Sequence, residues 1–107
     1  MAILKRTLTG EFDAVLEKVK TAVMDCGETV SFEHGADYAT PTGRCSVMVF
    51  ERYSMLGGNR VSMNITLFQS GENIELCAIT SGGSQAMFWK ITPLGEESFL
   101  EKLERRL

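Results

Sequence analysis

Two different spacings of apolar residues divide the first part of the chain. Over residues 11–26 apolar side chains recur every three or four positions, which is the period of a helix with one buried face. They are Phe12, Val15, Leu16, Val19, Val23 and Cys26. Acidic residues near the start and Gly27 just past the end suit the two helix termini. We therefore predict a helix over residues 11–26, preceded by a strand over residues 3–9.

The middle of the chain predicts antiparallel strands with short turns between them. Residues 60–69 alternate apolar and polar positions, as a strand with one buried face does. Similar segments at 44–54 and 74–81 flank it. The intervening turns are rich in Gly, Pro, Asn and Ser and fall at residues 41–43, 57–59 and 70–73.

Two segments leave more than one interpretation open. A short strand is predicted at 29–34, and residues 37–40 either continue it beyond a bend or pair with it. Residues 86–91 suit either a last strand or a turn of helix, and we favour a strand. An apolar stripe that ends at Leu107 predicts a final helix over about residues 95–107.

These elements predict one α+β domain over residues 1–107. Its order is β-α-β-β-β-β-(β)-α, and the short turns favour a meander over parallel βαβ units. Each helix has a single apolar stripe. We therefore expect a curved antiparallel sheet of five to six strands with both helices packed on one face.

Composition narrows the classes of function. The 107 residues carry a net charge of −3 and a near-average hydrophobic fraction of 44%. The eleven basic residues are scattered among fourteen acids, whereas nucleic-acid and anionic-membrane binders concentrate basic charge on one surface. We therefore expect no nucleic-acid partner and no membrane partner.

Three well-separated cysteines, Cys26, Cys45 and Cys77, form neither a disulfide framework nor a zinc-binding pair. The N-terminal residues lack the apolar stretch of a signal peptide, and no run is long enough to span a membrane. We expect reduced thiols, a cytoplasmic location, and neither a metal nor another cofactor.

Two stretches resemble a family of small single-domain bacterial proteins without an assigned function. The first runs from Glu51-Arg52-Tyr53-Ser54 through Gly57-Gly58-Asn59-Arg60-Val61-Ser62 to Asn64. The second is Thr80-Ser81-Gly82-Gly83-Ser84-Gln85-Ala86, followed by Gly95-Glu96-Glu97 and Phe99-Leu100. The resemblance implies a bacterial cytosolic protein and supplies no catalytic residue. The element order also resembles TATA-binding-protein-like and helix-grip shapes, which is an analogy of fold alone.

Candidate catalytic groups are few. His34 is the only histidine, and the sequence offers no Ser or Cys that can be paired with it. We interpret it as a strand-end or surface residue and predict no catalytic residue.

A glycine-rich segment follows the strand at 74–81. Glycines and serines after a strand can direct backbone N–H groups at an anion, and here they are Ser81, Gly82, Gly83, Ser84 and Gln85. The segment lacks the lysine and the spacing of a phosphate-binding loop. We favour a bulge or bend, with an anion site as the alternative.

Two arginines flank the turn at 57–59. Arg52 and Arg60, with Asn59 nearby, would grip a carboxylate or phosphate if both side chains met at this end of the hairpin. Cross-strand pairing with an acidic neighbour such as Glu51 is the interpretation that we prefer.

The face of the sheet turned away from the helices is a candidate interface. If Val47 and Val49 face the helices together with Val61, Met63, Ile65, Leu76 and Ala78, five apolar residues point the other way. These five are Met48, Phe50, Phe68, Cys77 and Ile79. Such a patch marks an interface, whereas scattered apolar exposure is ordinary, and both interpretations stay open. Phe88 and Trp89 either extend the patch or close the core.

Three functional hypotheses follow. The first is a non-enzymatic binding or interaction module that forms a homodimer through the second sheet face. The second is a binder of a small anionic ligand, or a minor enzyme, that uses the 81–85 loop with Arg52 and Arg60. Nucleic-acid binding by the sheet is the third and the least favoured, because the chain is acidic.

Overall fold

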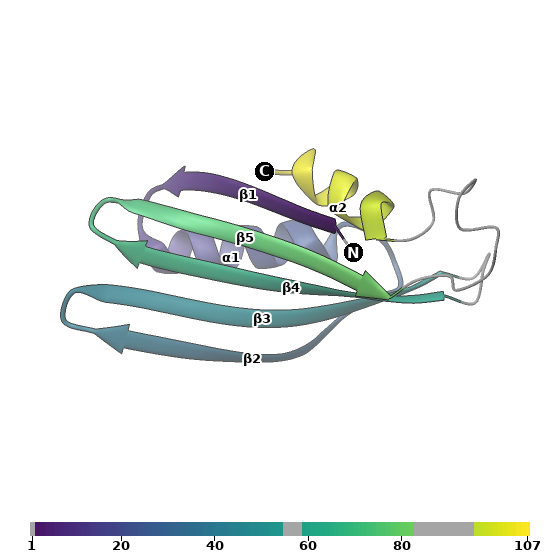
Figure 1. Ribbon diagram of the computed structural model, residues 1–107, viewed down its shortest axis with the longest axis horizontal. Coiled ribbons are helices and arrows are strands. Elements are labelled where there is room, and N and C mark those ends of the chain that lie inside the picture. Colours follow the sequence, from purple (N-terminus) through teal and green to yellow (C-terminus); the bar gives the residue numbers. More distant parts are fainter. Residues whose placement is uncertain (1, 55–58, 83–95) are drawn as a thin grey trace.

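A computed structural model describes residues 2–54, 59–82 and 96–107 of the chain (Figure 1). It contains strand β1 (Ala2–Thr9), helix α1 (Phe12–Met24), the strands β2 (Val30–Thr40), β3 (Gly43–Ser54), β4 (Asn59–Ser70) and β5 (Asn73–Gly82), and helix α2 (Glu96–Glu104). The segment 86–91, for which we favoured a strand, lies outside the described residues.

The described strands form one antiparallel sheet in the order β1-β5-β4-β3-β2. Strands β2 to β5 are consecutive hairpins, and β1 pairs with β5. Helix α1 joins the two edge strands and lies behind the sheet in Figure 1, while α2 lies beside β1. Because residues of both helices contribute to one hydrophobic core, both pack on the same side of the sheet. The α+β class, the element order and the one-sided packing of the helices are therefore confirmed.

Helix α1 begins at a side-chain cap. The backbone of Glu11 is extended, and its carboxylate accepts hydrogen bonds from the backbone N–H groups of Asp13 at 2.7 Å and Ala14 at 3.2 Å. These two donors lack partners within the helix, and the negative charge suits the helix N-terminus. The buried residues of α1 are Phe12, Val15, Val19, Ala22 and Val23. Four of these belong to the predicted stripe and Ala22 is an addition. Of the other predicted positions, Leu16 is half-buried, and Cys26 is buried just beyond the end of the helix.

Strand β2 is continuous. Residues 37–40 extend the strand begun at Val30, which is one of the two arrangements that the sequence allows. The pairing with β3 shifts by one residue between Phe32 and His34, so the bend near Gly35 is a β-bulge at Glu33.

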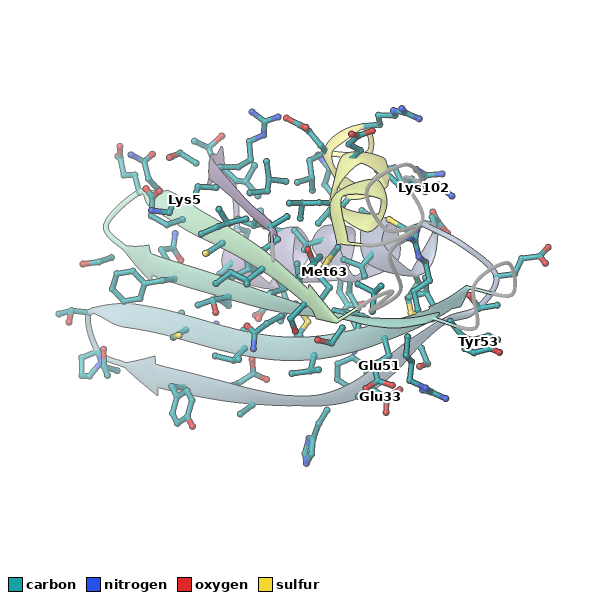
Figure 2. All side chains as sticks on the ribbon, turned by 45° about the vertical axis from the view of Figure 1, so that its right-hand side comes forward. Lys5, Glu33, Glu51, Tyr53, Met63 and Lys102 are labelled. Atoms are coloured by element: carbon teal, nitrogen blue, oxygen red, sulfur yellow. The ribbon has the colours of Figure 1, made fainter. Side chains whose placement is uncertain are left out.

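The core lies between the sheet and the two helices. Fully buried residues of β4 and β5 form its floor, and Val19, Val23 and Leu103 of the helices cover them. Figure 2 shows Met63 in this layer, while Glu33, Glu51 and Tyr53 lie at one end of the sheet.

The predicted orientation of β3 is wrong. Met48 and Phe50 are 3% and 0% exposed and belong to the core, whereas Val47 and Val49 are only half-buried on the other face. The register explains the orientation, because Phe50 lies opposite Met63 and Met48 opposite Ile65. Directly opposed residues in a sheet point to the same face.

In the described part of the chain, neither helix is long and apolar enough to cross a membrane.

Candidate functional site

The sheet has one face that no described helix covers, which we call the open face. It carries the side chains of β1 to β5 that alternate with the buried ones. Five large apolar residues are exposed there, namely Ile3 at 56%, Tyr38 at 63%, Tyr53 at 40%, Phe68 at 50% and Ile79 at 38%. Half-buried apolar residues lie between them, namely Cys45, Val47, Val49 and Cys77. A surface with this many apolar groups is the main candidate site.

The structure brings together only part of the predicted interface. Phe68, Cys77 and Ile79 lie on the open face, and Met48 and Phe50 are buried on the opposite side. Ile3, Tyr38, Tyr53 and the two valines of β3 also lie on the open face and are not among the predicted interface residues. The register between β3 and β4 decides which alternate residues of β3 face outward, and the prediction of the interface lacked it.

The apolar side chains of the open face form cross-strand groups. Ile3 lies opposite Ile79, and Cys45 lies opposite both Phe68 and Tyr38. These pairs occupy two strips separated by Asn64 and Thr66 of β4. The open face is therefore mixed, with apolar groups that can pack against another surface and polar groups that need hydrogen-bond partners if they are covered.

Charges on the open face are few and of both signs. Arg60 and Glu51 form an ion pair with a 2.6 Å nitrogen–oxygen distance near one end of the sheet. Glu75 accepts a hydrogen bond from the Thr7 hydroxyl at 2.9 Å, and Lys5 lies opposite Cys77. A surface with this balance does not repel a second copy of itself strongly.

The two arginines of the predicted anion site do not meet. Arg52 lies opposite Val61 on the core side and is 7% exposed, whereas Arg60 lies opposite Tyr53 on the open face. Opposed residues share a face and successive residues alternate between faces, so Arg52 and Arg60 point to opposite sides of the sheet. The two guanidinium groups therefore cannot grip one anion together. The preferred interpretation, pairing of Arg60 with Glu51, is the one found. The side chain of Asn59 lies outside the described part.

Arg52 is instead close to the C-terminal end of α1. Its Cδ atom is 3.8 Å from the position that a Cβ atom on Gly27 would take. Burial lowers the pKa of Arg52 from its usual value, and burial raises the pKa of the nearby Cys26 thiol. The cations Arg106, Arg52 and Lys102 partly oppose that second change. Cys26 donates a 3.3 Å hydrogen bond to the Ala22 carbonyl oxygen, so its environment is that of a packed structural thiol.

The described start of the glycine-rich segment supports a bend. The Ser81 and Ser62 hydroxyls are 2.8 Å apart and share a hydrogen bond on the open face. Gly82 has a φ of +92°, and a Cβ atom there would be 2.8 Å from the Arg60 carbonyl oxygen. Glycine is therefore required for chain geometry and close packing. Gly83, Ser84 and Gln85 lie outside the described residues.

His34 faces the open side, opposite Val49. Its Nδ1 atom accepts a 2.9 Å hydrogen bond from the Gly35 backbone N–H. In the described ranges no three His, Cys, Asp or Glu side chains gather as metal ligands, and the three cysteines are free thiols.

The chain belongs to DUF6054, a family of unknown function whose model matches residues 1–107. No curated protein matches the chain.

Proposed function

We propose that this member of a family without an assigned function is a non-enzymatic interaction module, and that it forms a homodimer by packing the open faces of two sheets together. The observation that carries the proposal is the exposure of five large apolar side chains on a face that no described helix covers, namely Ile3, Tyr38, Tyr53, Phe68 and Ile79. Exposed apolar patches on small proteins mark interaction sites.

The size of the open face suits such a dimer. Five strands about 4.8 Å apart give a width of roughly 24 Å, and about nine residues at ~3.3 Å each give a length of roughly 30 Å. The product is roughly 700 Å² per copy, close to the ~800 Å² that each partner buries in a standard interface. Two sheets packed in this way form a sandwich, a stable arrangement of two layers.

The charges of the open face support a second copy as the partner. In a two-fold interface each surface meets itself, so a face with a single sign of charge would repel its partner. Lys5 and Glu75 have opposite signs and lie on neighbouring strands of this face. A two-fold axis between two copies allows each lysine to approach the partner's glutamate, which favours pairing of like faces.

The test is the assembly state of matched variants. Ile79 on the open face and Met24 on α1 are 38% and 39% exposed, so each loses a similar apolar group on change to serine. We expect the wild-type protein to sediment as a dimer of the 11.8 kDa chain. Phe68→Ser with Ile79→Ser should give monomers, while Met24→Ser should remain dimeric. A wild-type monomer at every concentration would refute the proposal.

Thiol reactivity gives an independent measurement. Cys45 and Cys77 are half-buried on the open face, whereas Cys26 is in the core. If the faces pack together, alkylation of Cys45 and Cys77 slows as the protein concentration rises, because the dimer shields both thiols. Labelling rates that do not change with concentration, in a protein that sediments as a dimer, would place the interface elsewhere.

A further inference from the structure

Strand β2 presents a backbone edge in addition to the open face. It is the last strand of the sheet that the described residues form, and every residue from Ser31 to Thr40 is exposed. The bulge interrupts its pairing near Phe32, but the register from His34 to Thr40 is regular. A regular edge strand is a template on which another extended segment can add, because its outer N–H and C=O groups can pair with a new strand.

A groove of about 200 Å³ lies beside this edge, between α1 and the inner side of β2 and β3. We call it the α1–β2 groove. Its apolar lining comes from Leu16 of α1, Phe32 of β2 and Met48 of β3. Gly35 contributes no side chain, and a Cβ atom there would be 3.2 Å from the Phe32 ring and 3.5 Å from Met48. The position directly above Gly35 is therefore already filled by the Phe32 ring, and the Val47 carbonyl oxygen is closer still at 3.1 Å. The groove itself lies beside Phe32.

Two polar side chains of the groove, those of Ser46 and Asp37, make no hydrogen bond or ion pair with a residue that the structure describes. Ser46 is 2% exposed, lines the groove, and its hydroxyl makes no hydrogen bond with any residue that the structure describes. Buried polar groups are normally satisfied, so this hydroxyl indicates a partner that is not part of the described chain. Asp37 lies directly opposite Ser46 across the ladder. Its carboxylate also makes no ion pair or side-chain hydrogen bond within the described ranges.

The charges of the groove favour a ligand that carries a cationic group near Asp37 and Ser46. Glu17 of α1 also lines the groove, and its carboxylate forms no ion pair with a described residue. The one lysine in the lining, Lys20, holds its ammonium 4.5 Å from the centre of the Phe32 ring in a cation–π contact. Two unpaired carboxylates and a buried hydroxyl therefore remain for a ligand that donates hydrogen bonds.

We propose that the α1–β2 groove and the free edge of β2 bind an extended peptide, which adds to the sheet as a further strand along residues 34–40. A large apolar side chain of the peptide, placed opposite Gly35, packs against the Phe32 ring, which lines the groove and is 40% exposed. Side chains on one face of a strand recur every two residues. A Lys or Arg two positions away therefore faces Asp37, Glu17 and Ser46.

A second copy of the same strand does not fit this site. Residues 30–40 contain Glu33 and Asp37 and no lysine or arginine, so pairing of β2 with β2 brings only like charges together. The other edge strand, β1, contains Leu4 and Arg6 at the required spacing, but Arg6 already pairs with Glu104. A separate basic and apolar peptide is the occupant that the groove favours.

The test uses fluorescently labelled peptides of about nine residues, long enough to span an average strand. Because the described strands pair antiparallel, the peptide residue that faces Asp37 precedes the one that faces Gly35. The central position therefore holds Phe or Ala, the position two residues earlier holds Arg or Glu, and threonine fills the rest. We expect the Phe/Arg peptide to bind most tightly by fluorescence anisotropy. Asp37→Lys should weaken its binding roughly fivefold or more and should make the Phe/Glu peptide the tighter ligand. Glu72→Lys, the same charge change on the β4–β5 turn, should keep the wild-type order.

Hydrogen exchange separates strand addition from simple groove binding. The bound Phe/Arg peptide should slow exchange of amides within residues 34–40 and leave those of β1 unchanged. Absence of saturable binding by all four peptides at about 1 mM would overturn the proposal. So would an unchanged preference in Asp37→Lys, or polymers in which β1 of one copy occupies β2 of the next. Because Ile79→Ser leaves this groove intact, that variant should bind the peptide whether or not the open face forms a dimer.

Discussion

Phe50 lies directly opposite Met63 across the β3–β4 ladder, and both side chains are fully buried under the helices. Phe68, on β4, is half exposed on the other side of the same sheet. The two phenylalanines therefore differ in environment although both occupy apolar strands. We expect Phe50→Ser to lower the free energy of unfolding by at least about 3 kcal/mol, because it empties a core site and buries a hydroxyl.

Phe68→Ser should change the unfolding free energy of the monomer by less than about 1 kcal/mol, because the ring is half exposed. Urea unfolding of both variants, followed by circular dichroism at low protein concentration, measures the difference. Equal losses would contradict the orientation of β3.

The sequence pattern alone could not predict which residues of β3 face the core, and the reason is physical. Residues 47–50 are all apolar, so alternation cannot distinguish their faces. The register decides instead: Ser54 lies opposite Asn59, which places even-numbered residues of β3 with odd-numbered residues of β4. In β5 only the residues of one face are consistently apolar, so the same reasoning from alternation predicted Leu76 and Ala78 in the core correctly.

The candidate sites were harder to predict than the fold. Helix α1 and the hairpins follow from local patterns of a few residues. The open face and the α1–β2 groove depend on which residues lie opposite one another across several strands. Leu16, Phe32 and Ser46 are far apart in the sequence and line one groove, whereas the neighbouring positions Arg52 and Tyr53 point to opposite faces. Spacing alone does not contain that information.

Gly82 and Gly71 both have positive φ values but differ in their surroundings. A Cβ atom on Gly82 would be 2.8 Å from the Arg60 carbonyl oxygen, whereas one on Gly71 would meet nothing within 4 Å. Gly71→Ala should cost about 1 kcal/mol from backbone strain alone. Gly82→Ala should cost more, because the backbone of β4 must also move. Thermal unfolding of the two variants tests this order, and equal effects would argue against close packing of β4 and β5 at this point.

Glu11 should contribute to stability through its cap. Its carboxylate accepts two backbone hydrogen bonds at the start of α1. Glu11→Ala should lower the unfolding free energy by about 1 kcal/mol. Glu28→Ala removes the same group from an exposed position outside the helices and should change it by less than about 0.5 kcal/mol. If the two variants lose equal stability in urea, the cap contributes nothing specific.

We expect the buried thiol of Cys26 to make the protein less stable at alkaline pH. Burial raises its pKa in the folded chain above the ordinary value of 9.0, so the unfolded chain loses this proton first as the pH increases. The folded state then binds more protons than the unfolded state, and the free energy of unfolding falls with pH. The contribution of the neutral thiol is therefore fully present below about pH 9 and is lost as the pH rises through the folded-state pKa.

Cys26→Ala isolates this effect from the titration of lysines and tyrosines, which both proteins share. The variant should be less stable than wild type at pH 7, because it leaves a small cavity in the core. The stability difference should shrink as the pH rises above 9, since only the wild-type protein has a thiol to ionise on unfolding. Urea unfolding of both proteins across this pH range measures the difference. A difference that stays constant would show that the folded and unfolded thiols titrate alike, and that the core around Cys26 is open to water.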